Sequence, residues 1–152
     1  MKREGSIFEY EEQRNKDLMR AYKKLLREAH YIVLGDIYEK VVNMPSERFW
    51  VSERRAAIVV SNMLNNRPVG KMRQNKREMF EEIYRRVKER MKEYPGESVY
   101  NLTIDVVGEP APKFYLTPGS AKAIINKCER GWYEERGKII AEHKRKYRHL
   151  YM

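Results

Sequence analysis

The chain repeats part of its own sequence at a constant offset of 65 residues. Residues 45–64 begin Pro-Ser-Glu-Arg-Phe-Trp-Val-Ser, and residues 110–127 begin Pro-Ala-Pro-Lys-Phe-Tyr-Leu-Thr. Further along each copy, Val59-Val60 aligns with Ile124-Ile125. Self-similarity at a fixed spacing is typical of a duplicated structural unit. We therefore expect two similar units whose hydrophobic faces pack together.

Hydrophobic residues recur at three- and four-residue spacings through most of the chain, which predicts an all-α fold. The first such stripe predicts a helix from Ser6 to about Ala29, and a second runs from His30 to Val42. We predict two helical pseudo-repeats, about 6–64 and 75–130, that share one core. The predicted organisation is a first repeat (1–66), a basic linker loop (67–74), a second repeat (75–130) and a basic C-terminal helix or tail (131–152).

Start signals support a helix at the same position in each copy. Ser52 is a candidate N-cap for a helix to about Leu64, and Thr117 is a candidate N-cap followed by Pro118 at the first helical position. The segment 98–107 is ambiguous, because its alternating pattern also suits a strand. We favour a helix there, since an isolated strand has nothing to pair with.

Charge points to a polyanionic partner. The chain has 32 Lys and Arg against 22 Asp and Glu, a net charge of +10. This excess favours nucleic acid, with DNA first, over an acidic protein or membrane surface. A soluble helical protein with solvated basic faces is the plain alternative. The absence of a long apolar run and of an N-terminal apolar region predicts a protein without a membrane segment, located in the cytoplasm or associated with a virion.

The candidate nucleic-acid-binding residues are cations in three places: the helix after Ser52, the linker loop and the C-terminal tail. Such side chains suit phosphate contact, which positions a protein on its ligand without reading sequence. They are Arg54, Arg55, Lys71, Arg73, Lys76, Arg77, Lys144, Arg145, Lys146 and Arg148.

Two motifs suit contact with the bases of a nucleic acid in addition to its phosphates. Ser52 followed by Glu53, Arg54 and Arg55 resembles the recognition helix of helix-turn-helix proteins, although residues 43–51 make a longer turn than that motif uses. The aromatic pair Trp50 and Tyr115 either fills the core or offers stacking surfaces for bases.

No motif for catalysis, metal or cofactor appears. The three histidines are scattered, Cys128 is the single cysteine, and the sequence has no P-loop, Gly-rich dinucleotide turn or HExxH. We therefore predict a protein that is not an enzyme and has no cofactor.

The module Pro-x-x-(Arg/Lys)-Phe-(Trp/Tyr)-(Val/Leu)-(Ser/Thr)-x-x-x-Ala, present twice, resembles small uncharacterised basic proteins of bacterial phages and mobile elements. The resemblance implies no activity and no functional residue. Two hypotheses follow: a non-enzymatic DNA-binding protein of regulatory or packaging type, or a structural component such as a phage virion or connector protein. The second implies a homo-oligomer or an assembly with other proteins.

Overall fold

The computed structural model describes residues 2–28, 34–131, 138, 141–142 and 145 of the chain. The two long ranges hold six helices: α1 (Lys2–Glu28), α2 (Leu34–Val42), α3 (Glu53–Leu64), α4 (Gln74–Glu93), α5 (Val99–Val107) and α6 (Pro118–Glu129). These ranges contain no strand beyond a single isolated bridge, so the all-α prediction is confirmed. None of these helices combines the length and apolar character that crossing a bilayer requires.

Two helix starts differ from the sequence-based prediction. α1 begins at Lys2 rather than at Ser6. α2 begins at Leu34, and residues 29–33, where the prediction started this helix, lie outside the described residues.

The segment 98–107 is helical, as favoured over a strand. The Ser98 hydroxyl accepts a hydrogen bond from the backbone N–H of Asn101 at 3.1 Å and so caps α5. Within the helix, the Thr103 hydroxyl donates to the Val99 carbonyl at 2.7 Å. Local hydrogen bonds thus satisfy polar groups that a lone strand would have left without partners.

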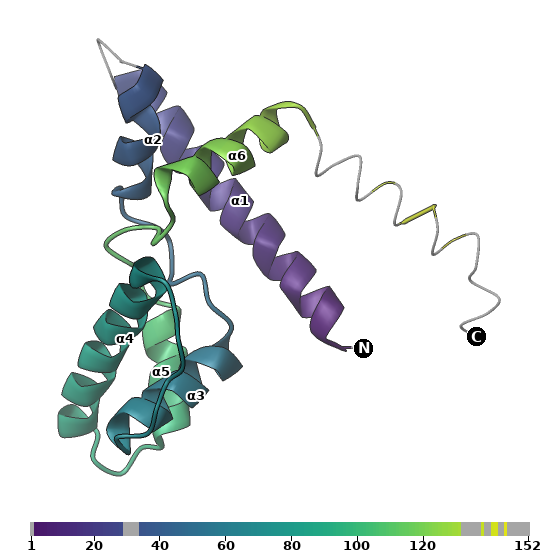
Figure 1. Cartoon of the computed structure of the whole chain (residues 1–152). Helices are drawn as coiled ribbons and strands as arrows, with labels where there is room; N and C mark the ends of the chain where they lie inside the picture. The colour runs from purple at the N-terminus through teal and green to yellow at the C-terminus, as the bar shows by residue number, and fades with distance from the viewer. Residues whose placement is uncertain (1, 29–33, 132–137, 139–140, 143–144, 146–152) are drawn as a thin grey trace.

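The helices pack as two lobes of three. α1, α2 and α6 contact one another, as do α3, α4 and α5, and among the described helices no pair is in contact across the lobes. Figure 1 shows α1, α2 and α6 at one end of the molecule and α3, α4 and α5 at the other. Each lobe therefore combines two helices of one half of the chain with the third helix of the other half.

Each lobe has a separate hydrophobic core, where the sequence predicted one shared core. One core lies between α3, α4 and α5, and the other between α1, α2 and α6. The first buries Phe49, Val51, Ala56, Val59, Val60, Met79, Phe80, Ile83, Val87, Leu102, Val106, Val107 and Ala111. The second buries Leu18, Ala21, Val41, Val42, Phe114, Ala121, Ile124 and Ile125.

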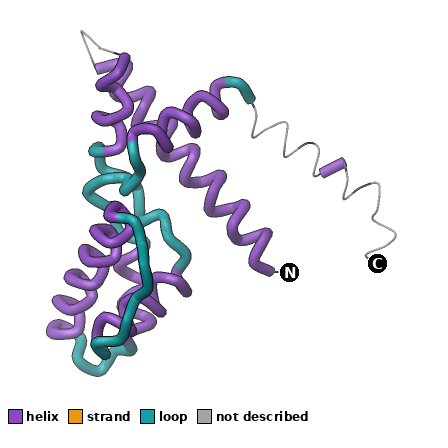
Figure 2. The backbone as a smooth tube through the Cα atoms, in the orientation of Figure 1, coloured by secondary structure: helices purple, strands orange, loops and turns teal. Residues whose placement is uncertain are grey.

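The two lobes are joined where the connections 43–52 and 108–117 cross. Ser46 and Ala111 form an antiparallel bridge, in which each backbone N–H donates to the other residue's carbonyl at 3.0 Å. On either side, the Phe49 N–H donates to the Val107 carbonyl at 3.0 Å, and the Phe114 N–H donates to the Val42 carbonyl at 2.9 Å. Figure 2 shows these connections as loops between the two groups of helices.

The crossing explains why there are two cores. After α2, the chain leaves its lobe along residues 43–52 and starts α3 in the other lobe, and after α5 it makes the reverse move. The third helices are thus exchanged between the halves. The bounds of α2 and α5, and those of α3 and α6, differ by the same 65 residues that separate the matching stretches of sequence.

The predicted caps of the exchanged helices are present. The Ser52 hydroxyl accepts from the Arg55 N–H, and the Thr117 hydroxyl accepts from the Ser120 N–H, each at 3.1 Å. Pro118 occupies the start of α6, where its missing N–H removes no hydrogen bond.

Candidate nucleic-acid interface

Seven exposed cations without ion pairs lie on α3 and on the segment that leads into α4. Within the described part of the chain, none of them pairs with a carboxylate. Two lie in the first turn of α3, three in the following loop and two at the start of α4. They are Arg54, Arg55, Arg67, Lys71, Arg73, Lys76 and Arg77. Figure 2 shows the loop running along the lobe from the end of α3 to the start of α4.

Three arginines further along α4 are neutralised instead. Arg85 pairs with Glu82 at 2.5 Å and with Glu89 at 2.8 Å. Arg86 pairs with Glu82 at 3.1 Å and reaches Glu109 in the connection after α5 at 3.3 Å, and Glu109 also pairs with Arg90. Hydrogen bonds from Arg85, and then from Arg86, hold the pKa of Glu82 below its ordinary value. These arginines have a structural role, because carboxylates within the protein already balance their charge.

The start of α4 is electropositive. Its N-cap residue, Arg73, makes no side-chain capping hydrogen bond, and the first turn holds no acidic residue. The backbone N–H groups at a helix start carry partial positive charge and favour anions. Here Lys76 and Arg77 add full charges to the same turn.

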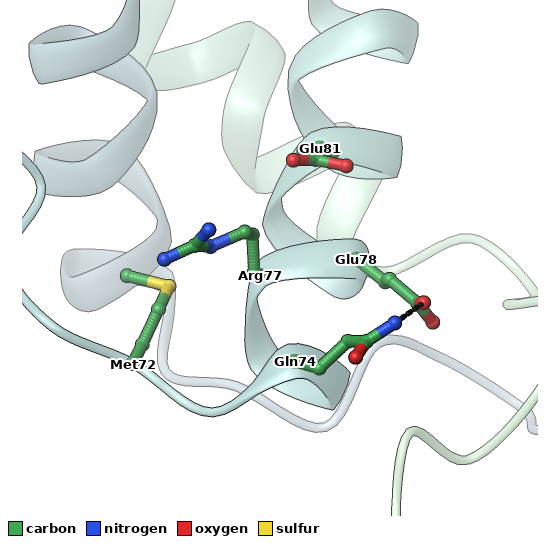
Figure 3. A pocket seen from close by; sticks show the side chains of 5 residues that line it. All are labelled: Met72, Gln74, Arg77, Glu78 and Glu81. Carbon is green, nitrogen blue, oxygen red and sulfur yellow. Dashed lines mark hydrogen bonds between the residues drawn. The ribbon is translucent and has the colours of Figure 1, made fainter.

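A shallow groove of about 430 Å³ lies beside this turn, lined by Met72, Gln74, Arg77, Glu78 and Glu81 (Figure 3). The Glu78 carboxylate already accepts two hydrogen bonds, one from Lys113 at 3.0 Å and one from Gln74 at 3.1 Å. The hydrogen bond from Lys113 is the main reason why the pKa of Glu78 is lowered. Arg77 points away from Glu78, toward Met72 (Figure 3). Its charge therefore remains available to a ligand outside the groove.

The two aromatic candidates make contacts inside the protein. The indole N–H of Trp50 donates to Asp17 at 2.8 Å, Tyr10 packs edge-on against the ring at 5.6 Å, and the Arg48 guanidinium lies 5.3 Å from its centre. These contacts give Trp50 a structural role at the junction between α1 and the first connection.

The Tyr115 ring also makes its contacts within the protein. Its ring stacks on Phe49 at 6.1 Å, with the Lys113 ammonium 5.3 Å from its centre. Burial raises the pKa of Tyr115 to about 12. Its backbone is left-handed, with φ of 58°. Trp50 and Tyr115 thus occupy matching places in the two connections, with a cation over each ring.

The helix-turn-helix hypothesis needs correction in one respect. In that motif the recognition helix packs on the helix that precedes it in sequence. α2 and α3 are not in contact, because residues 43–52 carry the chain to the other lobe; the short helix that packs on α3 is α5. The supporting helix therefore comes from the other half of the chain.

The tail residues lie largely outside the described part of the structure. Lys144, Lys146 and Arg148 are not among the described residues, and Arg145 is a helical, exposed position. Sequence reasoning had left Arg67 out of the candidate set, although it stands in the same loop as Lys71 and Arg73. The Ile58 side chain of α3 is 43% exposed.

The described residues hold no candidate metal site. They contain no group of three or more His, Cys, Asp or Glu side chains placed to hold a metal ion. Cys128 is half-buried in α6, and burial raises the pKa of its thiol, which disfavours the reactive thiolate.

No protein-family model matches the chain, and neither a curated protein nor a solved structure matches it.

Proposed function

We propose that the protein binds DNA without catalysing a reaction, through the cations of α3, the α3–α4 loop and the start of α4. One observation carries this proposal: the exposed cations of this region have no carboxylate partner, whereas the neighbouring arginines of α4 are paired. Unpaired cations suit the phosphates of DNA, because each contact releases a counterion from DNA. The basic C-terminal tail, with Arg145, would extend the same contact.

The salt dependence of binding tests the proposal. Six or more phosphate contacts lower affinity about 10³- to 10⁵-fold between 50 and 200 mM salt. We expect a loss in this range for the full chain on a fluorescently labelled DNA duplex, followed by anisotropy. No binding at 50 mM salt would refute the proposal. Duplex RNA of the same sequence, measured in parallel, shows whether DNA is preferred.

A matched pair of double variants tests where on the protein DNA binds. Lys71→Gln with Lys76→Gln removes two cations from the proposed surface. Lys23→Gln with Lys24→Gln removes two exposed lysines from α1 in the other lobe. We expect the first pair to reduce the slope of log K against log salt by about 2, at about 0.9 per contact, and the second to leave it nearly unchanged. Equal effects would show that the contact is not localised.

A structural role in a larger assembly is the second proposal, and the turn between α4 and α5 favours it. Tyr94 is 57% exposed and Tyr100 is 50% exposed, so two large side chains stand at this end of the lobe. Aromatic side chains are common at the centres of protein interfaces. Light scattering on the purified protein separates the proposals: a ring-sized or larger particle without DNA favours assembly, and a small species that binds DNA favours the first.

The proposed setting follows from the ligand. A DNA-binding protein of this kind works in the cytoplasm, or in a virion if a phage encodes it. A phage or mobile-element origin agrees with the resemblance of the repeated module, and DNA packaging would join the two proposed roles.

A further inference from the structure

The exposed face of α3 carries side chains of three different chemistries. On the inner side, Ala56, Val59 and Val60 are fully buried against α4 and α5. Positions 54, 58 and 62 are four residues apart and so share one face of the helix. Arg54 and Ile58 are exposed on this face, and Asn62 is half-buried on it. None of the three makes a side-chain hydrogen bond or an ion pair within the described residues.

These three chemistries match the groups that DNA displays in its major groove. A guanidinium binds the O6 and N7 atoms of guanine, a carboxamide binds N6 and N7 of adenine, and an apolar side chain contacts the methyl group of thymine. Ile58 alone would mean little, because single exposed hydrophobic residues are common. Its position between an arginine and an asparagine, on the same helix face, is what suits a base edge.

The surroundings of α3 suit contact with a duplex. The helix is held from behind by α4 and α5, so its outer face is rigidly supported. Positive charge flanks it: Arg55 lies in its first turn, and Arg67 and Lys71 follow its C-terminal end. Phosphate contacts on both sides of a helix fix its position, while the helix itself meets the bases. Charge complementarity thus favours DNA over another protein on this face.

The matching helix of the other lobe lacks this chemistry. The positions in α6 that correspond to 54, 55 and 58 hold Gly119, Ser120 and Ala123. No guanidinium stands in its first turn, and a methyl group replaces the isoleucine. If the two lobes met DNA alike, only the α3 lobe would discriminate between bases.

We propose that α3 reads base edges in the major groove of duplex DNA, with Arg54, Ile58 and Asn62 as the residues that determine specificity. This inference rests on the proposed DNA binding and adds sequence preference to it. Because α6 lacks the equivalent side chains, each copy of the chain reads one short site through α3.

The test is a selection of duplexes from a random-sequence pool with the full-length protein, followed by sequencing. We expect enrichment of one short motif. Asn62→Ala and Ile58→Ala should each lower affinity for the enriched duplex about tenfold, because one good base contact discriminates by about 5- to 150-fold. Their affinity for unselected duplex should stay within about twofold of the original, with the same salt slope.

Leu26→Ala is the matched control for Ile58→Ala. Leu26 is also 43% exposed, but it lies on α1 in the other lobe. It should leave both affinities unchanged. Thermal unfolding of each variant checks that the fold is retained.

The possible outcomes distinguish base reading by α3 from DNA binding itself. Binding with a steep salt dependence but no enriched motif would overturn base reading and leave DNA binding intact. A motif that survives Arg54→Ala, Ile58→Ala and Asn62→Ala would place the reader elsewhere. Absence of binding at 50 mM salt would remove both proposals.

Discussion

Truncating a core side chain of α3 is expected to loosen helices that belong to the opposite half of the chain. Val60 is fully buried among α3, α4 and α5. Val60→Ala removes two buried carbon groups, at about 0.8 kcal/mol each, and leaves a small cavity, so we expect the lobe to lose about 2 kcal/mol. Since 1.4 kcal/mol is a factor of ten, the opening equilibrium of the lobe should rise about 30-fold.

Amide hydrogen exchange followed by mass spectrometry locates the effect. Peptides from α4 and α5 should exchange about 30-fold faster in the variant, while those from α1 and α2 change by less than about threefold. The reciprocal variant, Ile125→Ala in α6, should lower stability by about 2–5 kcal/mol and accelerate exchange in α1 and α2 instead.

Ile58→Ala serves as the control in the same helix, because this side chain is partly exposed and outside both cores. It should change exchange by less than about twofold. The reasoning would be refuted if Val60→Ala accelerated α1 and α2 and left α4 and α5 unchanged. That result would mean that α3 packs within its own half of the chain.

Two further predictions concern buried or paired carboxylates. The Asp17 side chain is fully buried and accepts hydrogen bonds from the Trp50 indole at 2.8 Å and the Glu47 backbone N–H at 2.9 Å. Asp17→Ala strands these two donors, removes the ion pair with Arg20 at 2.6 Å and should cost about 3 kcal/mol in urea unfolding; a loss below about 1 kcal/mol would contradict this. For Glu82, whose pKa is held below its ordinary 4.5 by Arg85, the unfolded chain binds its proton first as pH falls. Its stabilisation is therefore complete at neutral pH and is lost below about pH 4.5. Glu82→Gln should flatten part of this acid-side decline, and an unchanged pH dependence would count against the pairing.

Local features of the fold could be predicted because their causes are local. The spacing of Ala56, Val59 and Val60 predicted a buried helix face, and the hydroxyls of Ser52 and Thr117 predicted the starts of α3 and α6. Each of these signals lies within a dozen residues of the structure that it determines.

The exchange of α3 and α6 could not be predicted from the same signals. Their buried positions correspond one to one, with Ala56, Val59 and Val60 matching Ala121, Ile124 and Ile125. An amphipathic stripe shows which face is buried but not which pair of helices covers it. The choice is made by the connections, whose backbone hydrogen bonds at the crossing join residues far apart in sequence.

The candidate site also has some features that could be predicted from the sequence and others that could not. Cations in the α3–α4 loop were visible in the sequence, and so was the pairing of Glu82 with arginines three and four residues later. The link from Arg86 to Glu109 was not, nor was the Asp17 acceptor for Trp50, because both join separate elements. Tertiary pairing therefore decides which cations remain free for a ligand.

The exchanged helices also set the order in which the chain can fold during synthesis. α1 and α2 are made first, but the helix that completes their lobe, α6, is the last of the six in the described chain. The ribosome must release the chain through α6 before the first lobe can close. Until then, the apolar faces of α1 and α2 stay uncovered, and contacts between distant segments form slowly. The lobe of α3, α4 and α5 is complete once α5 has emerged and is therefore expected to fold first. Ser46 is then in place to form its backbone bridge with Ala111 when that residue emerges.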